Sequence, residues 1–241
     1  MTQARSESGN RSPKNDEAGC YFDTGARQFA FNMALDEALL EAMPRLNRPV
    51  LRFYAWTEPA ASFGYFQKYR EVERLTSLRP LVRRPTGGGV VPHEADWTYS
   101  MVWPETHAWY ALRAVESYRQ VHEWIQRAFA LLEVHTELAL HSVKTGPGQC
   151  FAGFERFDLL CRRRKIAGAA QRRTRDGLLI QGSVQPPSGG LFRSDWQRAM
   201  LQASAVPLPC WEEFVIDEAL TGRVLALAEQ KYSQAGYNER R

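Results

Sequence analysis

Arg-Arg-Pro-Thr-Gly-Gly-Gly-Val-Val-Pro-His, at residues 83–93, is the most informative stretch of this chain. Its three consecutive glycines carry no Cβ atom, so a ligand can approach the backbone closely and accept hydrogen bonds from its N–H groups. Arg83 and Arg84, just before the glycines, suit a carboxylate, a phosphate or the acidic surface of a partner. The same residues also fit a glycine-rich hairpin between two strands, with both arginines solvated.

The composition is that of an ordinary globular protein. The chain has 241 residues, of which 44% are hydrophobic and 12% aromatic, enough for one large domain or two small ones. The formal net charge of +4 is too small to argue for nucleic acid as a partner, but it suits a protein with an acidic face. Arg162, Arg163 and Arg164 form a basic cluster, which we interpret as a solvated turn.

The four cysteines are Cys20, Cys150, Cys161 and Cys210. They form no Cys-x-x-Cys pair and no spacing typical of zinc, so we predict no metal site. The N-terminus lacks the apolar core of a signal peptide, and no apolar run is long enough to span a membrane. We therefore expect a protein of the reducing cytoplasm, with no membrane partner and with free cysteines unless one is catalytic.

The order of predicted elements indicates an α/β (α+β) fold. Residues 1–18 are polar and predicted to be a disordered tail, and residues 20–241 are predicted to form a single domain. Periodicity predicts helices at 26–43, 110–134 and 217–234, and strands at 50–56, 61–65, 81–84, 96–103, 157–161, 165–171 and 177–184. This order favours a mixed, mostly antiparallel sheet flanked by helices. Asn32 and Asp36, one turn apart on the first helix, mark a functional edge or only a surface.

A second informative stretch begins at Lys165 and continues through Gly168, Ala169 and Ala170. Its small residues leave room beside the strand, as a narrow ligand tunnel would require. A lysine at the mouth of such a tunnel can hold a carbonyl or phosphate oxygen. The alternative is a strand that packs against a helix through small residues, with Lys165 reaching out to water.

Four motifs together resemble one known family. Residues 83–93 fit Arg-Arg-x-Ser/Thr-Gly-Gly-Gly-x-Val-x-His, residues 164–171 fit Gly/Arg-Lys-Ile/Val-x-Gly-x-Ala-Gln, and residues 32–39 fit Asn-Met-Ala-x-Asp-x-x-Leu. A strand-pair pattern completes the set: Arg52, Trp56, Pro59, Ser62, Gly64, Tyr65 and Gln67. Over residues 28–185 the chain resembles the lipoate–protein ligase A-like and octanoyltransferase branch of the biotin/lipoate protein ligase superfamily.

The resemblance implies a sheet flanked by helices, like the catalytic domain of class II tRNA synthetases. It also implies that the glycine loop and the Lys165 strand line a tunnel for a medium-chain acyl group. The residues that it would assign to this tunnel are Arg83, Arg84, Thr86, Gly87, Gly88, Gly89, His93, Gly168 and Ala170. The implied protein substrate is an acidic lipoyl domain or the glycine-cleavage H protein. One departure is the run at 94–97, where many members have a glycine and a leucine-asparagine pair.

Two chemistries share this family. A ligase activates free lipoate with ATP and magnesium, whereas a transferase takes octanoate from acyl carrier protein onto an enzyme cysteine and needs no cofactor. Cys150 and Phe151 form the Cys-Phe pair that cysteine-dependent octanoyltransferases have at this place. Only about 55 residues follow Val184, fewer than the accessory domain of many ligases would need. Both features favour the transferase, with Cys150 as nucleophile; the alternatives are a ligase, and a non-catalytic lipoyl-domain-binding protein.

The expected mechanism uses two catalytic residues. Cys150 attacks the octanoyl thioester, and Lys165 stabilises the developing charge on the acyl oxygen and helps keep the thiol ionised. Backbone N–H groups of the glycine loop orient the acyl head. His93 fits either a catalytic base or a residue that closes the loop by bonding a backbone carbonyl, and we favour the second. Asp158 matches the family motif without a chemical role of its own.

Overall fold

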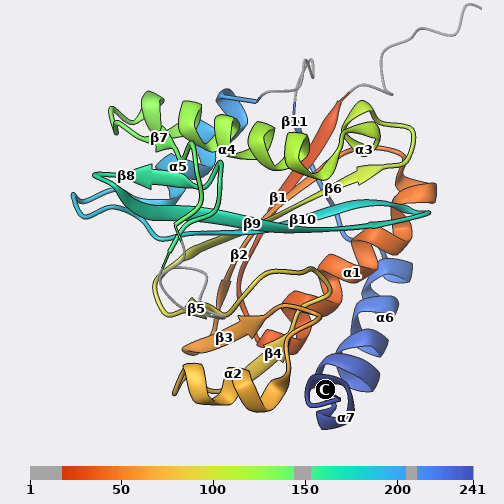
Figure 1. Ribbon diagram of the computed structural model, residues 1–241. Helices are drawn as coiled ribbons and strands as arrows, with labels where there is room; N and C mark the ends of the chain where they lie inside the picture. Colours follow the sequence, from red (N-terminus) through yellow and green to blue (C-terminus); the bar gives the residue numbers. More distant parts are fainter. Residues whose placement is uncertain (1–17, 144–152, 205–210, 241) are drawn as a thin grey trace, which may run out of the picture.

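The computed structural model describes residues 18–143, 153–204 and 211–240. Within these ranges the centre of the fold is an eight-stranded mixed sheet in the order β11-β1-β2-β6-β10-β9-β8-β7 (Figure 1). β1 runs parallel to β11 and to β2, and the other neighbours are antiparallel. The strands are β1 Gly19–Arg27, β2 Val50–Trp56, β6 Trp97–Pro104, β7 Glu137–Leu138, β8 Leu159–Cys161, β9 Arg164–Thr174, β10 Gly177–Val184 and β11 Trp211–Glu213.

A three-stranded sheet, in the order β4-β3-β5, carries the glycine loop. Its strands are β3 Ala60–Phe63, β4 Leu81–Arg83 and β5 Val91–His93, and the glycines lie in the connection between β4 and β5. The short helix α2, Tyr69–Leu75, packs against this sheet through Val72, which is fully buried. The small sheet thus brings the glycine loop to one face of the large sheet (Figure 1).

Helices cover both faces of the large sheet, which confirms the predicted fold class (Figure 1). The strand β6 separates two cores, because the side chains of Trp97, Tyr99, Met101 and Trp103 face one side and that of Val102 faces the other. The helices of the first side are α3 Ala108–Ala111, α4 Ala114–Leu131 and α5 Arg193–Gln202. Those of the second are α1 Phe29–Leu46, α6 Glu218–Leu227, the π-helix η1 Ala228–Tyr232 and α7 Ala235–Asn238.

The three predicted helices differ from the observed ones. The first begins at Phe29 rather than residue 26, because Ala26 and Arg27 still belong to β1, where they pair with β2. The predicted helix over 110–134 is divided, since α3 ends at Ala111 and α4 begins at Ala114. The helix predicted over 217–234 consists of α6, which ends at Leu227, and the π-helix η1, Ala228–Tyr232. Nearly all of the predicted tail, 1–18, lies outside the described residues. In the part of the chain that the structure describes, no helix combines the length and apolar character needed to cross a membrane.

Candidate active site

Arg84 binds the backbone of the glycine loop. Its guanidinium donates hydrogen bonds to the carbonyls of Gly87 (2.6 and 3.0 Å) and Gly89 (2.8 Å), and to Ser62 Oγ (3.3 Å). The residue is buried. The sequence suggested that this arginine could meet a carboxylate or phosphate; in the structure its guanidinium holds loop carbonyls, so we assign it to shaping the loop.

Arg83 joins the same segment to the helix α7. Its fully buried guanidinium donates to the carbonyls of Tyr65 (2.9 Å), Gln67 (2.7 Å) and Asn238 (2.8 Å) and lies 4.7 Å from the ring centre of Phe63. The backbone N–H of Arg83 donates to Asn238 Oδ1 at 2.9 Å. Arg83 therefore ties the start of the loop to α7 and to the segment after β3.

The glycine loop lies directly against β3 and β9. A Cβ atom added at Gly64 would lie 2.0 Å from the carbonyl oxygen of Gly88. Gly88 has φ +86, and a Cβ there would lie 2.7 Å from Arg84 Nη2 and 3.6 Å from the Cβ of Ala170. At these two positions the chain needs glycine, because any side chain would separate the loop from the strands beneath it.

Two neighbouring glycines provide a matched test of this packing. Gly88→Ala is expected to lower the free energy of unfolding by about 1–3 kcal/mol, since alanine is strained at positive φ and its Cβ would displace the Arg84 guanidinium. Gly87→Ala is expected to stay within about 0.5 kcal/mol of the wild type, because its Cβ would meet no atom within 4 Å. Urea denaturation measures both; equal losses would contradict the described loop geometry.

Thr86 points into the core through a chain of buried polar side chains. Thr86 Oγ1 donates to Gln181 Oε1 (2.7 Å), and Gln181 Nε2 donates to Asp36 Oδ2 (2.7 Å). Asp36 Oδ1 pairs with Arg52 Nη1 at 2.6 Å, and Asn32 Oδ1 accepts from Arg52 Nη2 at 2.6 Å. Asn32 and Asp36 were expected at a functional edge or on a surface; both are fully buried, so the surface interpretation is wrong.

His93 lies between two side chains. Its Nδ1 is 2.9 Å from Asp96 Oδ2, its Nε2 is 2.8 Å from Ser62 Oγ, and its ring stacks on Trp56 at 3.9 Å. This is the connectivity of a nucleophilic triad, but Ser62 also accepts a hydrogen bond from Arg84 and is itself buried. We therefore assign His93 to supporting the loop, through side-chain partners rather than the backbone carbonyl expected from the sequence.

Below this cluster is a cavity of about 30 Å³. A space of this size holds a water molecule, not an eight-carbon chain. The room expected beside β9 is also taken, because Lys165 occupies the space above Gly168 and the glycine loop covers Ala170. The cavity is lined by Met33, Tyr54, Trp56, Ser62, Arg84, Val91, His93, Thr98, Gln181, Gly182 and Ser183.

Lys165 forms a buried ion pair with Asp158. Lys165 Nζ lies 2.7 Å from Asp158 Oδ2, and the two side chains are 7% and 0% exposed. Asp158 Oδ2 also accepts the backbone N–H of Glu155 at 2.7 Å, and its Oδ1 accepts a hydrogen bond from the Tyr118 hydroxyl. A Cβ at Gly168 would lie 2.7 Å from Lys165 Cε and 2.8 Å from Nζ. Glycine at 168 thus leaves the space in which the lysine side chain lies.

Tyr118 and His122, one turn apart on α4, lie behind this ion pair. Burial, with Asp158 nearby, raises the pKa of Tyr118 well above its usual value, so the hydroxyl stays protonated and donates. Burial lowers the pKa of His122 to about 4. The neutral ring donates Nδ1–H to the Tyr118 carbonyl at 2.9 Å, and among the described residues its Nε2 has no partner.

This histidine predicts a dependence of stability on pH. The folded state keeps His122 neutral down to about pH 4, whereas in the unfolded chain it binds a proton near pH 6.5. Its effect is therefore absent above about pH 6.5, and stability falls as the pH drops from there towards 4, by up to about 3 kcal/mol. His122→Leu is expected to flatten the change in unfolding free energy between pH 7 and pH 5. An equally steep change in that variant would contradict the neutral assignment.

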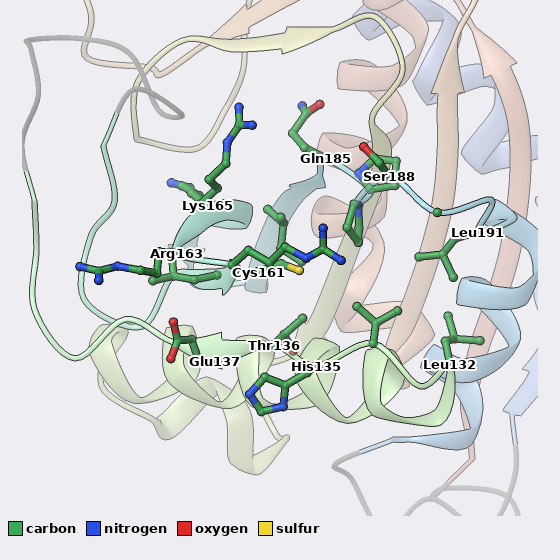
Figure 2. A pocket seen from close by; sticks show the side chains of 18 of the residues that line it. Leu132, His135, Thr136, Glu137, Cys161, Arg163, Lys165, Gln185, Ser188 and Leu191 are labelled. Atoms are coloured by element: carbon green, nitrogen blue, oxygen red, sulfur yellow. The ribbon is translucent and has the colours of Figure 1, made fainter.

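A groove of about 930 Å³ opens beside Lys165. Figure 2 shows Arg163, Lys165 and Cys161 near one wall, with Gln185 and Ser188 across from them. The groove is formed by the end of α4, the turn between β8 and β9, and the segment after β10. It gives the Lys165 region an approach from the surface.

Cys150, predicted from the sequence as the nucleophile, lies outside the described residues. Among the described cysteines, Cys20 is buried and Cys161 is half-buried beside the groove. Burial raises the pKa of the Cys20 thiol, which makes it a poor nucleophile. The structure describes no group of three or more His, Cys, Asp or Glu residues, within its described ranges, that could hold a metal ion.

The structure thus brings the glycine loop to the strand that carries Lys165. The side chains of Arg83, Arg84, Thr86 and His93 are all held by hydrogen bonds within the protein. The sequence alone gave no site role to Ser62, Gln181 and Tyr118, which complete these contacts. The spacing of His93 and Asp96, three residues apart, was the one local signal for a pair. The others come from distant strands and helices and leave no such signal.

Sequence comparison places this arrangement in a family. A family model, the lipoyl protein ligase A/B catalytic domain, matches residues 28–185, well over half of the chain. An octanoyltransferase LipM of Carboxydothermus hydrogenoformans is 40% identical over 162 residues, 64% of this chain and 60% of the relative. That of Bacillus subtilis is 35% identical over 177 residues, 68% of this chain and 64% of the relative. These alignments span less than two thirds of the relatives' length.

Solved structures show the same fold. The putative lipoate protein ligase Ta0514 of T. acidophilum, with bound lipoic acid, is similar with a TM-score of 0.75 and 18% identity, over 92% of this chain and 99% of that chain. A lipoate–protein ligase A bound with ATP is similar to the same degree, with a TM-score of 0.75 over 92% of this chain and 98% of the other. The motifs, the fold and the matched family model agree: the chain belongs to the lipoyl protein ligase A/B catalytic-domain family.

Proposed function

We propose that this protein is an octanoyltransferase of lipoate metabolism. It moves an octanoyl group from acyl carrier protein, through a thioester on Cys150, to a lysine of a lipoyl domain or of the glycine-cleavage H protein. Relatives named octanoyltransferase, 34–40% identical, support the activity. The observation that carries the proposal is the placement of Lys165. It lies on β9, the strand that faces the glycine loop, and its ammonium group is paired with Asp158.

The proposed reaction has two acyl transfers. In the first, the Cys150 thiolate attacks the thioester carbonyl, a new C–S bond forms, and the carrier thiolate leaves and takes up a proton. In the second, the neutral ε-amine of the acceptor lysine attacks the enzyme thioester. The amide bond forms, Cys150 leaves as a thiol, and the amine proton passes to it. Each attack places negative charge on the acyl oxygen, where the Lys165 ammonium would stabilise it.

Asp158 positions Lys165 for this role. The Asp158 carboxylate is itself fixed by hydrogen bonds from Tyr118 and from the backbone N–H of Glu155. It therefore holds Lys165 Nζ in one position. Preorganised charge stabilises a transition state because no reorganisation is needed when the charge develops. The acyl chain would enter between the glycine loop and β9 by displacing the loop from Ala170, since the existing cavity of about 30 Å³ is too small for it.

The transferase route needs no cofactor, and it needs a free thiol, as in the reducing cytoplasm. The alternative is an ATP- and magnesium-dependent ligase, and the ATP-bound structural neighbour shares only 18% identity and supports the fold alone. One structural neighbour is a bipartite lipoate protein ligase from Thermoplasma acidophilum, which was studied together with its E2 lipoyl domain. This neighbour, with the acidic partners expected for a basic chain, is the basis for proposing lipoyl domains as acceptors.

The purified protein, incubated with octanoyl–acyl carrier protein in the absence of ATP, is expected to gain one octanoyl group in its intact mass. The adduct should be absent from Cys150→Ala and present in the matched variant Cys161→Ala, whose thiol lies beside the groove. Loss of the adduct in Cys161→Ala alone would move the nucleophile to that residue.

The alternatives give different results in the same experiment. No adduct, with lipoyl-AMP forming once ATP, magnesium and lipoate are supplied, would make the protein a ligase. Neither adduct nor lipoyl-AMP, with retained binding to a lipoyl domain, would indicate a non-catalytic binding protein.

A further inference from the structure

Three arginines stand at the mouth of the groove beside Lys165. Arg162, Arg163 and Arg164 are exposed and line the groove, with Arg163 visible in Figure 2. Within the described part of the chain, none of their guanidinium groups forms an ion pair or a hydrogen bond, unlike that of the exposed Arg45, which pairs with Asp217. A charge cluster without intramolecular partners is available to another molecule.

The backbone of this turn is unfavourable for the residues that occupy it. Arg162 and Arg163 are the two residues between the paired positions Cys161 and Arg164, and their φ angles are +49° and +64°. A two-residue hairpin turn with positive φ at both residues favours Asn-Gly, and other residues are strained there. The chain thus carries two arginines at positions where stability alone would favour small residues, which points to a use for their charge.

We propose that this groove docks an acidic segment of the acceptor protein and directs its lysine to Lys165. The inference rests on the proposed function and names the surface that serves it. Three arginines, Arg162, Arg163 and Arg164, line the groove against the two carboxylates of Glu133 and Glu137, while the charge of Lys165 is paired with Asp158. Leu132, Val134 and Leu191 contribute apolar side chains to the same lining. An acidic hairpin with an apolar tip matches this lining in charge and in polarity.

Reach favours the acceptor over the acyl donor as the occupant. The acceptor lysine has only its four-carbon stem between backbone and amine, so its protein must dock within a few residues of the reacting carbonyl. A carrier protein delivers its thioester on a long flexible arm and can dock farther away. The groove includes Lys165 itself among its lining residues, next to the three arginines. It therefore offers the short approach that a lysine-bearing segment needs.

The turn allows a variant that removes charge without loss of stability. Arg162→Asn/Arg163→Gly places the favoured pair in the turn and should raise the melting temperature. The probe is an unmodified lipoyl domain with an acidic surface, and its dissociation constant is measured by calorimetry at low and moderate salt. We expect the variant to weaken binding about tenfold and to reduce the dependence on salt. Arg162→Lys/Arg163→Lys should bind nearly as the wild type does.

The matched control is Arg70→Gln/Arg74→Gln, which removes two exposed charges on α2, away from the groove, and should leave binding unchanged.

Unchanged binding of the turn variant would overturn the docking proposal, whether or not octanoyl transfer is observed. Transfer from octanoyl–acyl carrier protein to the enzyme should keep its rate in the turn variant. If only that step became slower, the groove would belong to the donor, and the docking proposal would also be overturned. Weaker binding in a protein that forms no octanoyl adduct would support the docking surface and reject the proposed function.

Discussion

Replacing Lys165 with methionine is expected to slow octanoyl transfer by about 100- to 1,000-fold, the effect of removing one donor from a preorganised oxyanion site. The methionine side chain is nearly as long as that of lysine and carries no charge, so the space above Gly168 stays filled while the charge is lost. Single-turnover transfer from octanoyl–acyl carrier protein to the enzyme, followed by intact mass, measures the effect directly. A rate within a few-fold of the wild type would remove Lys165 from the mechanism.

The same substitution leaves Asp158 buried without its cation, which is expected to cost about 3–5 kcal/mol of stability. Lys165→Met/Asp158→Asn separates the two effects, because it removes both members of the ion pair and keeps a polar group beside Tyr118. We expect the double variant to recover much of the stability and none of the rate. Recovery of the rate together with the stability would mean that Lys165 has only a structural role.

Asp36→Ala is expected to be the most destabilising single change on α1, with a loss of about 3–5 kcal/mol in unfolding free energy. Asp36 and Arg52 are both fully buried, and the carboxylate also accepts hydrogen bonds from Tyr54 (3.0 Å), Ser100 (2.7 Å) and Gln181 (2.7 Å). Without it, the Arg52 guanidinium keeps its charge in a site closed to water. For a chain of this size the melting temperature should fall by roughly 6–20 °C.

Glu41→Ala, on the same helix, is the control for this prediction. Glu41 pairs with Arg223 at 2.7 Å, but both side chains are more than one third exposed. An exposed pair of this kind contributes at most about 1 kcal/mol, so the melting temperature should change little. Similar losses in the two variants, measured by calorimetry, would contradict the importance given to the buried network.

Regular strands in the middle of the sheet could be predicted from the sequence, and short or irregular ones could not. The strands β2, Val50–Trp56, and β10, Gly177–Val184, have the predicted bounds, since they are rich in residues that favour extended backbone and lie within the sheet. β1 was missed because Gly25 and a change of register interrupt its pattern. β11 has three residues and pairs with a strand almost 200 positions earlier, so no local signal defines it.

The glycine loop and the Lys165 strand could be predicted as neighbours because their motifs are contiguous in the sequence and resemble one family. The partners of the buried charges could not. Arg84 looked suited to an anion, yet it binds the carbonyls of Gly87 and Gly89, a choice that depends on how the loop folds back. Asp158 gained a role only when the register change between β8 and β9 placed it beside Lys165.

The contacts between Arg83 and Asn238 join residues 155 positions apart. During synthesis the segment around residue 83 leaves the ribosome long before residue 238 does. Until then the backbone and guanidinium of Arg83 lack these partners in α7, and the glycine loop that follows has no finished support. The support that α7 gives to the glycine loop is therefore completed only after residue 238 has left the ribosome.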